Sequence, residues 1–191
     1  MIYLFTGIMS WSLVHLLTVT KHDLRAKIIA KIGTIGYRLL FSIIVIGSLA
    51  LIVYGWRQDE GLEIYYDIYS YGIVPALVLM IFACVLVATS FVKSNFNRKF
   101  RRPLLSGFSI WAIAHLLMNG DGRSLLLFAG MLVWSQLMIA FLNRRDGVWV
   151  NDQKYLPHQG AKVFCIGLLI FIGLVFLHPY ITGIDLQTLP H

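Results

Sequence analysis

Long apolar runs alternate with short charged segments along the whole chain. A helix needs roughly 20 predominantly apolar residues to cross about 30 Å of hydrocarbon. Runs near that length lie at residues 2–19, 37–56, 71–92, 104–119, 124–142 and 162–181, each bounded by charge or by a turn. This pattern predicts an all-α, polytopic transmembrane helical bundle of about six spans, and we expect residues 1–191 to form a single transmembrane domain.

Composition supports the same fold class. Hydrophobic residues make up 58% of the chain and charged residues only 13%, which is outside the usual composition of soluble domains. Residues 1–19 contain no basic segment ahead of the apolar run, so we interpret them as the first span and not as a cleaved signal sequence. We therefore expect the lipid bilayer to be a partner of the chain.

The net charge of +7 comes from short basic clusters in the connections between apolar runs. When six spans alternate in direction, all of the 16 Lys and Arg residues except Arg57 and Arg123 fall on the same side. Because basic residues concentrate in cytoplasmic loops, this side is predicted to face the cytoplasm, with both termini extracytoplasmic and the chain in a bacterial inner (plasma) membrane. No nucleic-acid partner is expected, since the basic residues follow the topology and do not form one continuous face.

Two of the predicted spans share a tryptophan–histidine motif. The first span contains W-S-L-V-H-L-L from Trp11 to Leu17, and the fourth contains W-A-I-A-H-L-L from Trp111 to Leu117. Residues four apart share one face of a helix, so each histidine should lie beneath its tryptophan. The first and fourth spans run in opposite directions, and a three-plus-three inverted repeat would produce such a pair, although the rest of the two halves matches poorly.

His15 and His115 are the candidate metal ligands. An ionisable side chain inside lipid usually marks a functional site that faces the bundle interior. Both histidines lie beyond the middle of their spans, and helical side chains tilt toward their own N-terminus, so both imidazoles are expected to point toward the middle of the bilayer. Two neutral imidazoles suit the axial positions of haem iron. A structural role is the alternative, because a neutral histidine can also hydrogen-bond across helices.

Zinc is a less suitable metal than haem iron for this pair, and the other histidines are less suitable ligands. Two histidines without Cys or acidic partners fall short of the usual zinc coordination set. His22 is interpreted as an interfacial residue, and His178, just before Pro179, as a residue at a helix end. Arg38, Arg102 and Arg123 are possible partners of the haem propionates, because a guanidinium binds a carboxylate in a bidentate manner. The candidate cofactor-binding residues are therefore His15, His115, Trp11, Trp111, Arg38 and Asn119.

A longer signature surrounds the second histidine. It reads R-P-L-L-S-G-F-S-I-W-A-I-A-H-L-L-M-N-G-D from Arg102 to Asp121, and S-L-L-L-F-A-G follows it from Ser124. Supporting segments are His15 itself, G-Y-R-L-L-F-S at residues 36–42 and H-P-Y-I-T-G at residues 178–183. In these segments, and over nearly its whole length, the chain resembles the NnrU family of integral membrane proteins, which also includes the plant zeta-carotene cis-trans isomerase.

The resemblance implies a polytopic membrane protein. Through the carotene isomerase branch it also implies haem b, held by histidines that match His15 and His115. Bacterial members are associated with denitrification, so the resemblance implies support of nitrogen-oxide metabolism. One position departs from the family pattern: a histidine commonly precedes the proline of the signature, and here Arg102 stands in its place. A role of that histidine in substrate handling or ligand exchange therefore does not carry over to this chain.

Four functions are compatible with these patterns. The leading hypothesis is a haem b protein that supports nitrogen-oxide metabolism, and the second is a haem-dependent cis-trans isomerase of an apolar polyene such as zeta-carotene. A membrane methyltransferase would have to hold S-adenosylmethionine in the loop at residues 143–161, which has no Gly-rich turn. The fourth is a scaffold or assembly factor without a ligand. Whether the chain is an enzyme stays open at this point.

Overall fold

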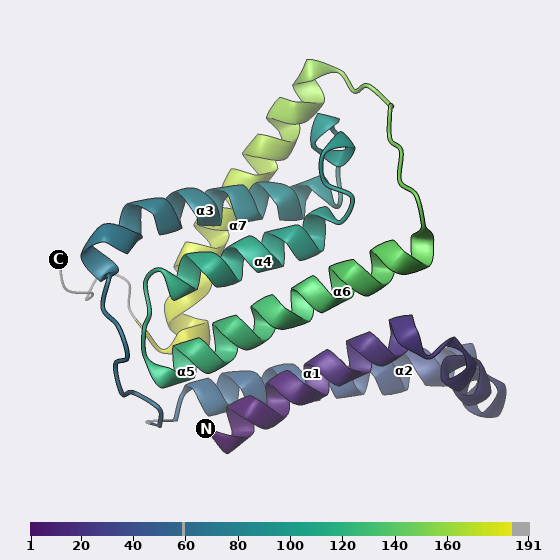
Figure 1. Cartoon of the computed structure of the whole chain (residues 1–191), viewed down its shortest axis with the longest axis horizontal. Helices are drawn as coiled ribbons and strands as arrows, with labels where there is room; N and C mark the ends of the chain where they lie inside the picture. The colour runs from purple at the N-terminus through teal and green to yellow at the C-terminus, as the bar shows by residue number, and fades with distance from the viewer. Residues whose placement is uncertain (59, 185–191) are drawn as a thin grey trace.

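Helices form most of the structure, a computed structural model that describes residues 1–58 and 60–184 (Figure 1). Residue 59 and residues 185–191 of the expected single domain lie outside the described residues. In chain order the helices are α1 (Ile2–Thr20), α2 (His22–Trp56), α3 (Tyr69–Thr89), the short η1 (Asn95–Arg98), α4 (Pro103–Leu116), α5 (Gly122–Ser124), the π-helical η2 (Leu125–Ala129), α6 (Gly130–Asp146) and α7 (Pro157–Thr182).

Five stretches are long and apolar enough to cross a membrane. They are Ile2–Thr20, Asp23–Trp56, Tyr71–Thr89, Gly122–Asp146 and Pro157–Thr182. The sixth apolar helix, α4, has 14 residues and is therefore only about 21 Å long at 1.5 Å per residue. The predicted all-α bundle is confirmed, and the chain is an integral membrane protein. The three-plus-three inverted repeat stays a prediction.

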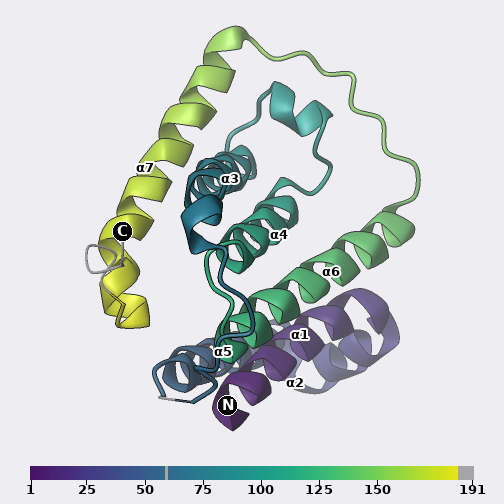
Figure 2. The same ribbon diagram turned by 60° about the vertical axis from the view of Figure 1, so that its left-hand side comes forward.

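The second helix begins earlier than its apolar run predicts. α2 extends back to His22 and bends at Gly33, whose φ of 74° and ψ of 168° interrupt the helical backbone. A residue with a Cβ rarely adopts a positive φ, so glycine suits this position. The bend turns residues 22–32 away from the direction of the rest of α2, close to the end of α1 (Figures 1 and 2).

Small residues allow α1 and α2 to pack closely. A Cβ built on Gly7 would lie 2.8 Å from the backbone nitrogen of Ile52 and 2.9 Å from the carbonyl oxygen of Ser48. Leu4 and Ile8 form a buried cluster with Ile52 beside this contact. Lipid tails are as apolar as the helices, so close van der Waals packing is what holds such helices together. The same packing positions α1, the helix that carries the first histidine of the motif.

α6 lies between α1 and α4, and α3 packs against α4 and α7 (Figures 1 and 2). A buried polar network joins α4 to α6: the Oγ atoms of Ser109 and Ser135 are 2.8 Å apart, and Nε2 of Gln136 donates to Oγ of Ser109 at 2.7 Å. Hydrogen bonds of this kind connect membrane helices at sites where no water is available. The order of the helices places α1 and α4 on opposite sides of α6.

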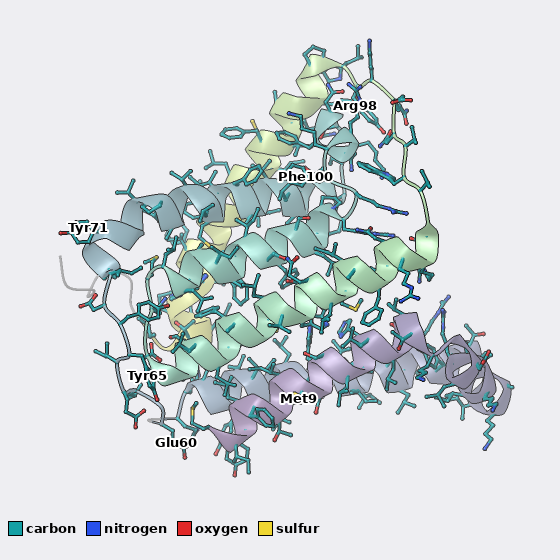
Figure 3. The ribbon with its side chains drawn as sticks, in the orientation of Figure 1. Met9, Glu60, Tyr65, Tyr71, Arg98 and Phe100 are labelled. Carbon is teal, nitrogen blue, oxygen red and sulfur yellow. The ribbon has the colours of Figure 1, made fainter. Side chains whose placement is uncertain are left out.

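The connections between helices gather at two ends of the bundle. Arg98 lies at one end, whereas Glu60 and Tyr65 lie at the other (Figure 3). At the first end Arg102 pairs with Asp146, which ties the start of α4 to the end of α6. This alternation agrees with the predicted order of spans. The assignment of the basic end to the cytoplasm stays a prediction.

Candidate functional site

The first histidine of the motif is oriented by its own helix. Nδ1 of His15 lies 2.7 Å from the carbonyl oxygen of Trp11, one turn earlier in α1. A carbonyl oxygen can only accept, so Nδ1 carries the hydrogen and donates it. The neutral ring therefore keeps its free lone pair on Nε2, the nitrogen that can bind a metal. The Trp11 and His15 ring centroids are 4.5 Å apart, as expected for residues four apart on one helix face.

The second histidine repeats this local geometry in α4. Nδ1 of His115 lies 2.9 Å from the carbonyl oxygen of Trp111, and the two ring centroids are 5.1 Å apart. Nε2 again keeps the lone pair. Asn119, the other predicted site residue near this histidine, donates from Nδ2 to the carbonyl oxygen of His115 at 3.0 Å. Its amide therefore stabilises the end of α4 in this structure.

Aromatic rings surround both imidazoles. His15 contacts Phe41 of α2 and Trp134 of α6, with ring centroids 5.3 and 5.4 Å away. His115 stacks on Phe128 of η2, with centroids 4.4 Å apart and an angle of 23° between the planes. Both imidazoles therefore contact the continuous helical stretch formed by η2 and α6. His15 contacts it from α1, and His115 contacts it from α4.

A chain of ring contacts connects the two histidines. Trp134 contacts Phe108 of α4 at 6.0 Å, and Phe108 contacts Trp111 at 6.1 Å between centroids. We call Trp11, Phe108, Trp111, Phe128 and Trp134 the aromatic cluster. One haem held by both histidines would require the first and fourth spans to bring their imidazoles toward each other. In the structure α6 lies between α1 and α4, and the two imidazoles are connected through the rings of Trp134, Phe108 and Trp111.

Two buried indole N–H groups beside His15 have no hydrogen-bond partner among the residues that the structure describes. Nε1 of Trp11 and Nε1 of Trp134 are both buried without a hydrogen-bond acceptor. Leaving a buried donor unpaired costs roughly 1–3 kcal/mol. Both indoles touch His15, so two unpaired N–H groups and one free imidazole nitrogen occur together. A bound group with acceptor atoms could pair with these donors. The sequence motif indicated Trp11 here, but nothing in it indicated Trp134.

A third histidine lies near the end of α7. Nδ1 of His178 is 3.3 Å from both the carbonyl oxygen of Ile184 and Oγ1 of Thr182. Ile184 packs against the buried cluster that contains Phe128, the ring on which His115 stacks. The interpretation of His178 as a residue at a helix end agrees with its place in the last turns of α7, which ends at Thr182. The sequence did not indicate that the end of α7 reaches the surroundings of Phe128.

The arginines considered for haem propionates lie in different surroundings. Arg38 is exposed on α2, one turn before Phe41, the residue that touches His15. The guanidinium of Arg102 pairs with Asp146 at the end of the bundle, so it is not available to a propionate. Arg123 donates to the carbonyl oxygen of Trp56 at 2.9 Å and lies over the Trp56 ring at 4.7 Å. Arg38 therefore has the guanidinium that is most available to a ligand beside His15.

The chemistry of these donors fits haem b. Haem iron needs only two axial ligands from the protein, and two neutral imidazoles with free Nε2 atoms are a suitable pair. No three His, Cys, Asp or Glu side chains gather within residues 1–58 and 60–184 as a metal held by the protein alone would usually require. The aromatic surroundings, of which Phe128 and Trp134 are buried, offer apolar surface to a large ring system, and in this structure those rings contact the imidazoles themselves.

Comparison with known proteins identifies a family. The model of the family described as NnrU protein matches residues 3–186, nearly the whole chain. No curated protein matches the chain, and no solved structure matches it.

Proposed function

We propose, from the premise that this chain belongs to the NnrU protein family, that it binds haem b, and that His15 and His115 are the residues that would hold the iron. One observation carries the proposal. In both histidines Nδ1 donates to a carbonyl oxygen one turn earlier, which leaves Nε2 free and fixes the ring's orientation. A hydrogen bond from the opposite ring nitrogen is the usual support of a metal-binding histidine.

The surroundings supply what a buried porphyrin needs from a protein. The aromatic cluster provides apolar surface, and the unpaired indole N–H groups of Trp11 and Trp134 provide donors. Arg38, exposed one turn from Phe41, is the candidate partner of a propionate. Haem b bound here would supply one-electron redox chemistry, while the chain's own residues orient the ring and keep water away from it.

Binding by both histidines requires a change in packing. α6 separates α1 from α4, and Trp134 and Phe128 lie against the two imidazoles. One iron atom can reach both Nε2 atoms only if aromatic side chains between them move. We therefore propose that rings of the aromatic cluster would move when the two histidines hold haem, so the environment of Trp134 would differ between the chain with haem and the chain without it.

The cellular role follows from the family resemblance and not from the geometry. We propose that the chain lies in a bacterial inner membrane, with both termini extracytoplasmic, and that its haem supports nitrogen-oxide metabolism. The basic residues at the end of the bundle that holds Arg98 favour this orientation by the positive-inside rule. Deletion of the gene should slow anaerobic growth on nitrite, and the His15→Ala and His115→Ala forms should fail to restore it.

Haem content measured on purified protein tests the cofactor proposal. The protein is produced with haem supplied, purified in detergent, and assayed for haem b by pyridine haemochrome formation. We expect about one haem per chain in the wild type, and a loss of most of it in His15→Ala and in His115→Ala. His158→Ala is the matched control, because His158 is exposed in the first turn of α7 and should retain haem. A colourless wild-type protein that folds normally would refute the proposal.

A further inference from the structure

A basic segment precedes the bend in α2. Residues 22–32 form the part of this helix before Gly33, and they carry three basic residues, Arg25, Lys27 and Lys31, against one acidic residue, Asp23, with Lys21 just ahead of them. The segment lies at the same end of the bundle as Arg98 (Figures 1 and 3). Basic residues next to a membrane surface attract anionic lipid headgroups.

One face of this segment closes a groove against the α1–α2 pair. The groove has a volume of about 130 Å³, and its wall includes Leu17, Leu24, Ile28, Leu40 and Phe41. Pockets for drug-sized ligands are larger, roughly 300–1,000 Å³. The groove therefore suits a stretch of one hydrocarbon chain better than a large ring system such as haem.

The rim of the groove is cationic. Lys21 and Arg25 both line it and both are exposed. The guanidinium of Arg25 lies 5.6 Å from the centre of the Tyr37 ring, which orients it at the groove. The ion pairs formed by the described residues all lie at other places in the molecule. Two cations without a carboxylate partner thus stand at the mouth of an apolar groove.

We propose that this groove binds an anionic phospholipid, with part of one acyl chain between α1 and α2 and the phosphate between Lys21 and Arg25. Charge complementarity selects the occupant: the apolar wall fits hydrocarbon, the rim fits a phosphate, and basic residues at a membrane surface attract anionic lipids. Phe41 belongs to the groove wall and also contacts His15. A lipid in the groove would therefore contact a direct neighbour of His15. This proposal does not rest on haem.

Lipid retention in native mass spectrometry tests the proposal. Purified protein in detergent receives equal amounts of phosphatidylglycerol and phosphatidylcholine with the same acyl chains. We expect the wild type to retain phosphatidylglycerol preferentially. The double variant Lys21→Gln/Arg25→Gln should bind it roughly 10- to 30-fold more weakly, because each basic residue near the headgroup contributes about a fivefold preference.

Two further variants make the result specific. Lys27→Gln/Lys31→Gln removes the same charge from the same segment at positions outside the groove, and it should keep the preference. Ile28→Trp fills the groove and should reduce retention of both lipids. If the two double variants lose the preference for phosphatidylglycerol equally, the preference depends only on the net charge of the segment, and the proposal is overturned. A wild type that shows no preference, or that retains a second copy of the chain in place of lipid, would also overturn it.

Discussion

Replacing Gly7 by alanine should destabilise the contact that positions α1. A Cβ at Gly7 would stand 2.8 Å from the backbone nitrogen of Ile52, 2.9 Å from its Cγ1 and 2.9 Å from the carbonyl oxygen of Ser48. Two of these three atoms belong to the backbone of α2, so a change of rotamer cannot relieve the overlap. Overpacking of this kind costs roughly 1–3 kcal/mol. The helices must move apart, and His15 would move with α1.

The matched control is Gly47→Ala, in the facing helix. Nothing lies within 4 Å of a Cβ built on Gly47. Alanine in a helix interior is favoured over glycine by about 0.5–1 kcal/mol, so this variant should be neutral or slightly more stable. Unfolding of both variants in mixed detergent micelles, followed by far-UV circular dichroism, gives the two free energies of unfolding. If Gly7→Ala unfolds no more easily than Gly47→Ala, the close packing of α1 on α2 is wrong.

Three other predictions concern the rest of the bundle. Ser109→Ala removes the hydrogen bond to Ser135 and should lower the free energy of unfolding by about 0.6 kcal/mol and by no more than about 1.7 kcal/mol, the average and the maximum for such bonds between membrane helices; an unchanged value would contradict the network. Gly33→Ala places a Cβ on a residue with a φ of 74° and a ψ of 168°, a region that is almost exclusive to glycine, and should cost about 1–3 kcal/mol, whereas a straightened and equally stable α2 would show that the bend is dispensable. Burial, and then the charge of Asp121, raise the pKa of Tyr66, so the folded state holds this proton more tightly than the unfolded state. This contribution to the free energy of unfolding is fully present below pH 10, the usual pKa of tyrosine, and is lost as the pH rises through the pKa of Tyr66 in the folded state. In Tyr66→Phe the free energy of unfolding should lack this decrease at alkaline pH.

The spans were predictable because the bilayer dictates them. A single apolar run of about 20 residues satisfies all of its own backbone hydrogen bonds in lipid when it forms a helix. The sequence placed the second span at residue 37, and the structure shows helix from His22. Residues 22–32 are too polar to be recognised as part of a span, and a single glycine inside a helical pattern does not show whether the helix bends there.

The site was predictable only within each helix. The spacing in Trp11–His15 and Trp111–His115 predicts which residues share a face, and the ring contacts agree. The neighbours of each helix were not predictable, because all faces of these helices are apolar and the contacts depend on small residues and shape. For that reason the separation of the two histidines by α6, and the contact of Trp134 with His15, could not be predicted from the sequence.

Electron paramagnetic resonance of the oxidised, purified protein with haem tests the central claim most directly, because it reports how many strong ligands the iron has. Two imidazoles on one ferric iron give a low-spin signal, and removal of either one should produce a high-spin, five-coordinate signal in the haem that is retained. We predict a low-spin wild type and high-spin residual haem in both His15→Ala and His115→Ala. A low-spin signal that survives the loss of either histidine would show that the iron takes another ligand and would contradict the pairing of His15 with His115.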